Sequence, residues 1–477
     1  MQIRRSMWIT FIFSNANTIV MFAVTLVLAR LLTPEEVGVF SIAVAFINFV
    51  AVFRDWGGRV FLIRSKELTD EQIGSVLGLM ITTSWVLAAA MWLGKQALAN
   101  YFKEDQIAVV LSILIISFLL VPFASVLSSL LVRNLSAGRN AFVNLTSTAV
   151  YAATCLGLAA NDYGSTAPAW ANVANLVCNV VCYWIVKPKG FRFQPRFRGW
   201  REVISYGGGV TLGNAMTTIN QALPDFAIGR SLGAHEVGLF SRANGLVGLL
   251  QQGIGPVLNF NALPILARRH HEAPEEFIDL FSKSLAYLTV IAWPVLAFIA
   301  IYPNEIIELL YGRTWLAASP LVPWLCAAEA ARVSSHLVNP ALYAIGRPYA
   351  SAFIIFSGLA GRMLLIVALG AADLVQVAIC FFVADIGVTL ASGAMAQRCF
   401  GFSPRMLLSS QAPSLRVLLA CAAVSGSVAL ICDKTALSGL AVLGIAAATT
   451  AITWVITIHY LAHPVMDELR KKSAKKP

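Results

Sequence analysis

Long apolar stretches alternate with short polar connections along nearly the whole chain. Fourteen such stretches occur, at residues 7–29, 38–60, 74–99, 107–132, 140–160, 166–186, 203–229, 236–262, 280–303, 318–344, 349–370, 374–397, 412–432 and 437–460. A run of about 20 apolar residues crosses a hydrocarbon core of roughly 30 Å as an α-helix. The pattern therefore predicts an all-α polytopic membrane protein with about 14 transmembrane helices joined by short loops.

The composition agrees with membrane insertion and excludes a soluble globular protein. Of the 477 residues, 58% are hydrophobic and 12% are charged, whereas a soluble domain carries roughly 25% charged residues. The eight cysteines lie mostly inside apolar runs and form no CxxC pair, so we interpret them as small buried side chains. The sequence predicts no metal ligands, no disulfide framework and no cofactor.

The positive charge is concentrated on one side of the predicted membrane. The chain carries 35 Lys and Arg against 24 Asp and Glu, a formal charge of +11. An even number of spans places both termini on one side, and with the N-terminus inside, 24 Lys and Arg fall in inner connections and seven in outer ones. This bias predicts cytoplasmic termini and contact with membrane lipids. It also accounts for the basic charge without a nucleic-acid partner.

A basic segment divides the pattern into two similar halves. Residues Lys187–Arg201 read KPKGFRFQPRFRGWR, with six spans before this segment and six of similar length after it. The stretch Leu28–Ala43, LARLLTPEEVGVFSIA, returns as Ile228–Ala243, IGRSLGAHEVGLFSRA, with eight of 16 positions identical at an offset of 200 residues. Because spans 1 and 7 run in the same direction, this duplication predicts two six-helix lobes related by a parallel repeat.

The predicted organisation has five parts. These are an N-terminal lobe at 1–186, a basic cytoplasmic linker at 187–202, a second lobe at 203–397, two further helices at 398–460 and a basic cytoplasmic tail at 461–477. Two such lobes would enclose a central site that opens to each side of the membrane in turn.

Two hairpins carry a resemblance to a known family. The segment VLARLLTPEEVGVFSIAVAF and the following RDWGGRVFLIRSKELTDEQ resemble the first hairpin of the polysaccharide-transport family of oligosaccharide flippases, the Wzx type. The segment PDFAIGRSLGAHEVGLFSRANGL resembles that family's repeat of the hairpin. The resemblance runs from about residue 5 to residue 400. It implies membership of the multidrug/oligosaccharidyl-lipid/polysaccharide flippase superfamily.

The resemblance also implies a function and a location. Proteins of this kind lie in the bacterial inner membrane and move polyprenyl-phosphate- or diphosphate-linked oligosaccharides between the leaflets. They serve the assembly of O-antigen, capsule or exopolysaccharide. Polysaccharide polymerase and export proteins are the partners that this function implies.

Three other functions compete with the flippase. A glycan polymerase or ligase would need an aqueous loop with gathered carboxylates or basic groups. The loops here are short, and the sequence holds no GxSxG, HExxH or GK[ST] motif, so we expect no enzyme. A cation-coupled antiporter would need acidic residues deep in the first lobe, and spans 7–29, 74–99, 107–132 and 140–160 hold no Asp or Glu at mid-depth. Uptake of a small metabolite is the remaining alternative.

Polar side chains inside the apolar spans are the candidates for substrate contact. Amide groups in spans 1 and 7 would bind sugar hydroxyls, and they belong to Asn15, Asn17, Asn214, Asn220 and Gln221. Hydrogen bonds between helices explain these residues equally well. Arg54, near the inner end of span 2, is a candidate for binding the carrier phosphate. Local pairing with Asp55 or snorkelling is the alternative.

Charged residues also flank the outer ends of the two hairpins. Arg30 and Arg230 occupy equivalent helix ends, where each would complement the terminal carbonyl groups. The resembling family commonly carries charge at Asp225, Arg230 and Arg242. These residues are therefore candidates for an outer-gate ion pair.

The deepest charges lie in the second predicted lobe. Glu329, Arg332 and His336 follow one another at spacings of three and four in span 10, so we expect them on one helix face. Arg362 in span 11 and Asp385 in span 12 complete the set. One interpretation is a structural network of two ion pairs, Glu329–Arg332 and Arg362–Asp385. In the other, the two arginines bind the substrate phosphate, and the acidic residues or His336 change partner or protonation during gating.

Overall fold

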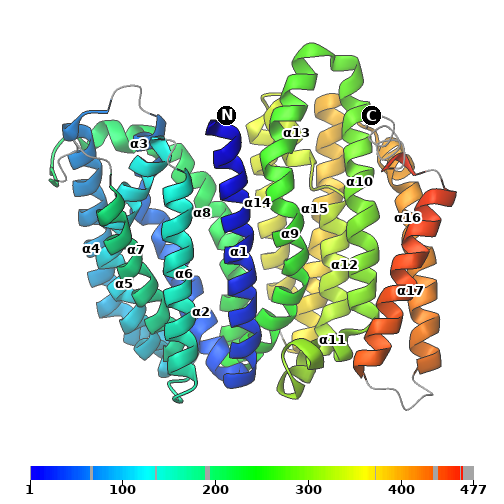
Figure 1. The fold of residues 1–477 in the computed structure, drawn as a ribbon, viewed down its shortest axis with the longest axis horizontal. Coiled ribbons are helices and arrows are strands. Elements are labelled where there is room, and N and C mark those ends of the chain that lie inside the picture. Colours follow the sequence, from blue (N-terminus) through cyan, green and yellow to red (C-terminus); the bar gives the residue numbers. More distant parts are fainter. Residues whose placement is uncertain are drawn as a thin grey trace. The chain divides into compact units, whose positions relative to one another are not determined.

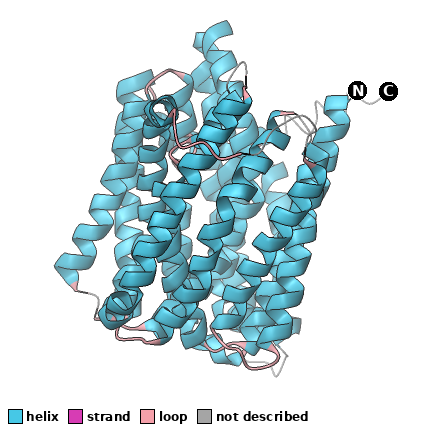
Figure 2. Cartoon of the chain, turned by 90° about the vertical axis from the view of Figure 1, so that its left-hand side faces the viewer, coloured by secondary structure: helices cyan, strands magenta, loops and turns pink. Residues whose placement is uncertain are grey.

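The computed structural model of the chain is helical throughout the residues that it describes, which are 2–64, 68–134, 137–187, 194–370, 372–432, 439–461 and 463–465. Over these residues it contains α-helices, one 3-10 helix and connecting turns, and no strand (Figures 1 and 2). The helices are α1 (Gln2–Leu31), α2 (Pro34–Asp55), α3 (Gly58–Arg64), α4 (Asp70–Phe102), α5 (Gln106–Arg133), α6 (Ala137–Ala159), α7 (Thr166–Val186), α8 (Trp200–Ser231), α9 (Ala234–Glu272), α10 (Pro274–Ile301), α11 (Pro303–Leu310), η1 (Arg313–Leu321), α12 (Val322–Val333), α13 (Val338–Ala344), α14 (Pro348–Leu369), α15 (Leu374–Phe400), α16 (Pro404–Cys432) and α17 (Gly439–Tyr460).

Many of these helices suit a membrane. In the described part of the chain, ten are long and apolar enough to cross one, namely α2, α4, α5, α6, α7, α10, α14, α15, α16 and α17. They expose large apolar side chains such as Leu93, Ile185 and Val367, a surface that hydrocarbon accepts and water does not. The prediction of an all-α polytopic membrane protein is confirmed. The number of 14 spans stays a prediction.

Two of the expected spans are interrupted. The span expected at 38–60 ends at Asp55, because Trp56 (φ 38°) and Gly57 (φ 67°) adopt the left-handed conformation that terminates a helix. The span expected at 318–344 is divided into η1, α12 and α13, with turns at 334–337. Apolar composition indicates that a segment lies in the membrane, but it does not report a break in the backbone.

The chain divides into two compact units, Met1–Gly238 and Leu239–Pro477. In the first unit, α4 packs on α5, α5 and α6 pack on α7, α1 packs on α6, and α2 packs on α8. In the second, α10 packs on α12 and α16, α12 and α14 pack on α15, and α16 packs on α17. Figure 1 shows these neighbouring helices within each unit. The division into five parts stays a prediction, and residues 188–193 of the expected linker and 466–477 of the expected tail lie outside the described residues.

Each unit has its own tightly packed interior. Leu77, Met80 and Val126 are fully buried between α4 and α5. In the second unit, the ring of Phe281 meets that of Phe402 edge to face, with 4.9 Å between the centroids. Lipid is as apolar as these side chains, so close van der Waals packing holds the helices together rather than removal from water.

The two hairpins that repeat in sequence also repeat in their helix boundaries. Helices α1 and α8 end at Leu31 and Ser231, and the next helices begin at Pro34 and Ala234. Before α2, the Thr33 hydroxyl accepts a hydrogen bond from the Glu36 N–H at 3.3 Å, and the Glu36 carboxylate accepts one from the Thr33 N–H at 2.8 Å. This capping box fixes the start of α2.

A pair of equivalent glycines lets the two hairpins approach closely. A Cβ atom on Gly38 would lie 1.7 Å from the carbonyl oxygen of Ala234, and one on Gly238 would lie 1.8 Å from that of Pro34. Gly38 and Gly238 are related by the offset of 200 residues, and so are Pro34 and Ala234. The contact is therefore reciprocal, and it sets the position of the first turn of α2 against the first turn of α9.

Candidate functional site

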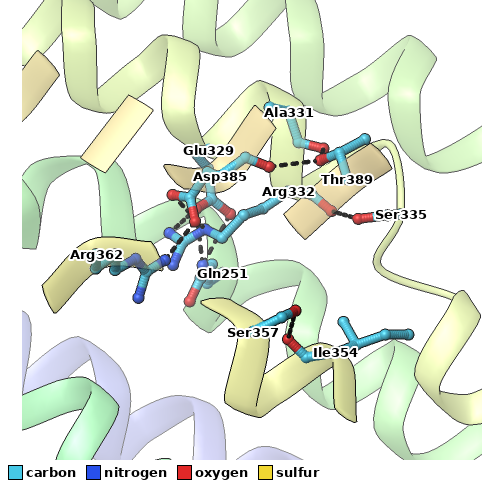
Figure 3. A network of polar contacts seen from close by, with 10 residues as sticks. All are labelled: Gln251, Glu329, Ala331, Arg332, Ser335, Ile354, Ser357, Arg362, Asp385 and Thr389. Carbon is cyan, nitrogen blue, oxygen red and sulfur yellow. Dashed lines mark hydrogen bonds and ion pairs between the residues drawn. The ribbon is translucent and has the colours of Figure 1, made fainter. Parts of the chain in front are cut away.

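Four charged side chains form a network among α12, α14 and α15 in the second unit. Glu329 and Asp385 each expose 1% of their surface, and Arg362 exposes 6%. Arg332 pairs with Glu329, and Arg362 pairs with Asp385 (Figure 3). The Nε atom of Arg332 lies 3.8 Å from an Asp385 oxygen. This contact joins the two ion pairs into one network.

The network is electrically balanced. Two guanidinium groups face two carboxylates, so no net charge remains where an unpaired one would cost about 2.5–3.5 kcal/mol on the insertion scale. Gln251 of α9 donates hydrogen bonds of 2.8 Å to both oxygens of Glu329. The Thr389 hydroxyl of α15 donates to the Ala331 carbonyl at 2.8 Å. Through these contacts α12 is tied to both α9 and α15.

Arg332 is the accessible member of the network. Of its side chain, 36% is exposed, against 7% for Arg362 and 2% for each carboxylate. A guanidinium can bind a phosphate through two parallel N–H groups, so Arg332 can contact an anion from within the network. Arg362 is instead covered by Phe381, whose ring centroid lies 5.1 Å from the guanidinium carbon.

His336 follows α12, the helix that carries Glu329 and Arg332 of this network. Helix α12 ends at Val333, and residues 334–337 form turns, so the helical spacing from Glu329 and Arg332 does not continue to His336. Its side chain is exposed. The expectation of one unbroken helix over 318–344 was wrong, and a common face of the three residues stays a prediction. A role of His336 in gating stays a prediction.

The amide side chains singled out in the first unit have separate surroundings. Thr148 of α6 donates a hydrogen bond to the Asn17 side-chain oxygen on α1, so Asn17 connects two helices. Asn15 is exposed on α1, and Asn220 is partly buried on α8. Asn214 falls in α8, but its side chain lies outside the described residues.

Arg54 is engaged locally at the C-terminal end of α2. Its Nε donates to Asp55 at 2.8 Å, and its guanidinium carbon lies 5.2 Å from the centroid of the Phe118 ring. The Thr83 hydroxyl of α4 donates to the Arg54 carbonyl at 3.0 Å. Only 13% of the Arg54 side chain is exposed, which leaves little of it for a lipid phosphate.

A cavity of about 180 Å³ lies between α2 and α8 in the first unit. Its polar lining consists of Ser41 and Asn48 from α2 and Thr218, Gln221 and Asp225 from α8. The three residues of α8 follow at spacings of three and four, which places them on one helix face. Within the part of the chain that the structure describes, Asp225 makes no ion pair or side-chain hydrogen bond.

The arginines of the repeated hairpins lie away from Asp225. Arg30 and Arg230 occupy the last turns of α1 and α8. The Arg230 guanidinium carbon lies 4.9 Å from the centroid of the Tyr101 ring. Five positions along an α-helix correspond to a rotation of about 140°, so Asp225 and Arg230 leave α8 on different sides. The expected ion pair between them is not formed in this structure.

Arg242 belongs to the second unit. Its guanidinium carbon lies 5.2 Å from the ring centroid of the buried Trp315 and 5.8 Å from that of Tyr311. Such cation–π contacts hold a cation on an aromatic surface, and here they connect α9 with η1. A role of Arg242 in an outer gate stays a prediction.

Two amide side chains at these sites were not singled out from the sequence. Gln251 binds Glu329 in the network, and Asn48 lines the cavity with Asp225. Each interrupts a long apolar run. A systematic search for every uncharged polar residue inside the runs, rather than for charged ones and for spans 1 and 7, would have found both.

Comparison with known proteins gives consistent matches. Residues 27–320 match the model of a family described as polysaccharide biosynthesis protein. Over 307 residues the chain is 23% identical to the teichuronic acid biosynthesis protein TuaB of Bacillus subtilis (strain 168), which covers 61% of this chain and 60% of TuaB. Over 324 residues it is 19% identical to the lipopolysaccharide biosynthesis protein WzxC of Escherichia coli (strain K12), which covers 67% of this chain and 65% of WzxC. The chain thus matches less than two thirds of the length of these two relatives.

The fold is similar to that of a solved flippase. The lipid II flippase MurJ in its inward closed conformation superposes with a TM-score of 0.77 at 13% sequence identity. The match covers 96% of this chain and 99% of the MurJ chain. At this level of identity the likeness concerns the fold.

Proposed function

Because the chain belongs to the family of polysaccharide biosynthesis proteins, we propose that it is a flippase that moves a polyprenyl-linked oligosaccharide between the leaflets of a membrane. The resemblance of its two hairpins to the Wzx type is confirmed by the similarity to WzxC. The fold shared with a lipid II flippase supports transport of a lipid-linked saccharide rather than an enzymatic reaction.

The observation that carries this proposal is the partly exposed guanidinium of Arg332, which belongs to a buried network with no net charge. A polyprenyl phosphate or diphosphate is anionic, so its passage needs a cation inside the apolar helices. Arg332 supplies that cation, since Arg362 already pairs with Asp385 and Gln251 already binds Glu329. When Arg332 turns to a phosphate, Asp385 keeps its ion pair with Arg362 and Glu329 keeps its hydrogen bonds from Gln251.

The proposal extends to the substrate and its surroundings. The cargo would be a saccharide repeat unit for O-antigen, capsule or exopolysaccharide, carried in the bacterial inner membrane. Both termini would lie in the cytoplasm, and polymerase and export proteins would take up the product on the outer side. Two lobes that open alternately would provide the path.

Depletion of the protein in its host tests the function directly. We expect lipid-linked oligosaccharide to accumulate on the inner leaflet, measured as protection from an impermeant glycan-modifying reagent, while surface polysaccharide falls. Normal export after depletion, in cells without a paralogue, would contradict the proposal.

A pair of arginine variants tests the role of the network. Arg332→Ala should abolish export while the protein reaches the membrane in normal amount, and Arg332→Lys should restore only part of it because a lysine lacks the bidentate geometry. The matched control is Arg313→Ala, which removes an exposed arginine paired with Glu308 and should export normally. Wild-type export from Arg332→Ala would remove this residue from the substrate path.

A further inference from the structure

A second cavity of the first unit is an apolar groove of about 410 Å³ between α2 and α4. Its lining comes from Phe46 and Val50 of α2 and from seven residues of α4 between Leu87 and Tyr101. None of these lining residues is charged, and the Tyr101 hydroxyl is their single polar side-chain group. We propose that the groove binds one acyl chain of an anionic phospholipid, and that Arg230 of α8 binds the phosphate of the same lipid.

Small residues form the floor of this groove. Ala90, Gly94 and Ala97 line it and follow one another at spacings of four and three, so they lie on one face of α4. No atom lies within 4 Å of a Cβ atom added to Gly94, which shows that the space above this residue is open. A hydrocarbon chain can therefore lie close to the backbone of α4 and make van der Waals contacts along its length.

The length of the groove matches one leaflet of a membrane. An α-helix rises about 21 Å between positions 87 and 101, and half of a bilayer with its headgroups is about 20–22 Å thick. Polar side chains gather in the last two turns of α4, at Lys95, Gln96 and Asn100, which marks the Tyr101 end as the headgroup level. A phospholipid chain fits this length, whereas a polyprenyl chain is longer than one leaflet is deep.

Helix α2 lines the deep part of the groove. A Cβ atom on Gly229 would lie 2.8 Å from the side chain of Ile42 and 3.2 Å from that of Phe102, so these residues of α2 and α4 lie at one level. Phe46 and Val50 follow Ile42 by about one and two helical turns, which places them about 6 and 12 Å deeper. The methyl end of a bound chain would therefore contact both helices.

Arg230 supplies a cation at the headgroup end. Its guanidinium carbon lies 4.9 Å from the centroid of the Tyr101 ring, and the residue is exposed. A guanidinium that stacks on an aromatic ring keeps the N–H groups at its edge, which can bind a phosphate through two parallel hydrogen bonds. Arg230 makes no ion pair within the described part of the chain, so a lipid phosphate would neutralise it.

The two carboxylates that follow α4 are engaged elsewhere. Glu104 accepts a hydrogen bond from the Gln106 N–H at 3.3 Å, and Asp105 accepts one from the Gln96 amide at 3.5 Å. The cation of Arg230 is therefore left to the lipid, and it favours an anionic headgroup over a zwitterionic one.

Native mass spectrometry of the purified full-length protein tests the site, with dioleoyl phosphatidylglycerol compared with dioleoyl phosphatidylcholine. We expect the wild type to bind one phosphatidylglycerol about tenfold more tightly than phosphatidylcholine. Arg230→Gln, which keeps the stem of the side chain and removes its charge, should bind the two lipids equally. Gly94→Leu, whose side chain fills the groove, should weaken the binding of both lipids about tenfold.

Each variant has a matched control. Arg313→Gln removes an exposed arginine that pairs with Glu308 in the second unit, and it should keep the preference for phosphatidylglycerol. Gly157→Leu adds the same side chain to α6, where no atom lies within 4 Å of the added Cβ either. It should bind both lipids as the wild type does.

Three results would overturn the proposal. Equal binding of the two lipids by the wild type, or an unchanged preference in Arg230→Gln, would remove the headgroup site. Equal effects of Gly94→Leu and Gly157→Leu would assign the bound lipid to the general surface of the helices. Displacement of phosphatidylglycerol by an equal concentration of a polyprenyl phosphate, absent in Gly94→Leu, would assign the groove to the carrier lipid. No saccharide is transported in these measurements, so each result leaves the flippase proposal to the depletion experiment.

Discussion

The two units treat charge inside their helix bundles in opposite ways. In the second, Glu329 and Asp385 are neutralised by two arginines of the same chain. In the first, Asp225 lies in a cavity lined by neutral oxygen donors and has no partner among the described residues. A charge that is paired within the chain is neutralised whenever the chain is folded. A charge without such a partner makes the stability of the fold depend on the pH and the ions of the surrounding solution.

The largest expected effect comes from breaking the paired charges. Asp385→Ala would leave Arg362 buried without its carboxylate, and should lower the free energy of unfolding by about 3–5 kcal/mol. Chemical unfolding in nanodiscs, or the amount of protein reaching the membrane, measures this loss. The double variant Arg362→Met/Asp385→Leu removes both charges and should recover most of the stability. If the single and double variants are equally unstable, the pair is not the source of the effect.

A smaller loss is expected where α2 approaches the second hairpin. The Cβ of Gly38→Ala would lie 1.7 Å from the Ala234 carbonyl oxygen, and the helices must separate to accept it. We expect a loss of about 1–3 kcal/mol in the free energy of unfolding, measured by thermal unfolding. Gly94→Ala is the matched control, because no atom lies within 4 Å of the added Cβ. Equal behaviour of the two variants would show that the glycine contact does not position α2.

Removing the carboxylate of Asp225 should raise the free energy of unfolding, whereas the two preceding variants lower it. Asp225→Asn removes a carboxylate that makes no ion pair among the described residues, and should raise the free energy of unfolding by about 1 kcal/mol. Thermal unfolding at pH 7.5 measures this change. A clear loss of stability would mean that Asp225 has a structural partner, and the contrast between the two units would then fail.

The smallest expected effect concerns the imidazole of His463, whose neutral form is favoured by burial. His463 follows α17, is fully buried, and has its Nε2 3.2 Å from the Ser414 hydroxyl. Burial lowers the pKa of His463 below its ordinary value of 6.5. The unfolded chain therefore takes up a proton that the folded chain refuses, and stability is lost as the pH falls below about 6.5. Unfolding at pH 7.5 and 6.0 should show a loss of less than about 1 kcal/mol in the free energy of unfolding, and His463→Asn should reduce it.

Helices and charge pairs were the parts that the sequence predicted well. Long apolar runs predicted α5 and α7 closely, because about 20 such residues in a membrane must be helical. The same physics predicted the contacts of Arg332 and Arg362 with carboxylates, since a charge at that depth must find a partner. The structure contains both ion pairs.

The other predictions about the site failed or were incomplete, mostly because the sequence does not report local backbone geometry. Helix α12 ends at Val333, before His336, and the expectation of an unbroken helix overlooked Ser334 and Ser335, which favour turns. The expected pair of Asp225 with Arg230 neglected the rotation over five helical positions. Asn48 and Gln251 were passed over because an amide inside an apolar run carries no charge that demands a partner.

The glycine contact bears on the ancestry of the chain. Gly38 meets Ala234 as Gly238 meets Pro34, which is the self-complementary contact of a symmetric dimer. In a half-length ancestor that paired with its own copy, one glycine codon would have served both contacts at once, and one mutation would have damaged both. Fusion of two such copies would have made the two positions separate targets for mutation. A larger residue at either would still press on the other repeat, so the fused protein keeps a constraint that its dimeric precursor would have set.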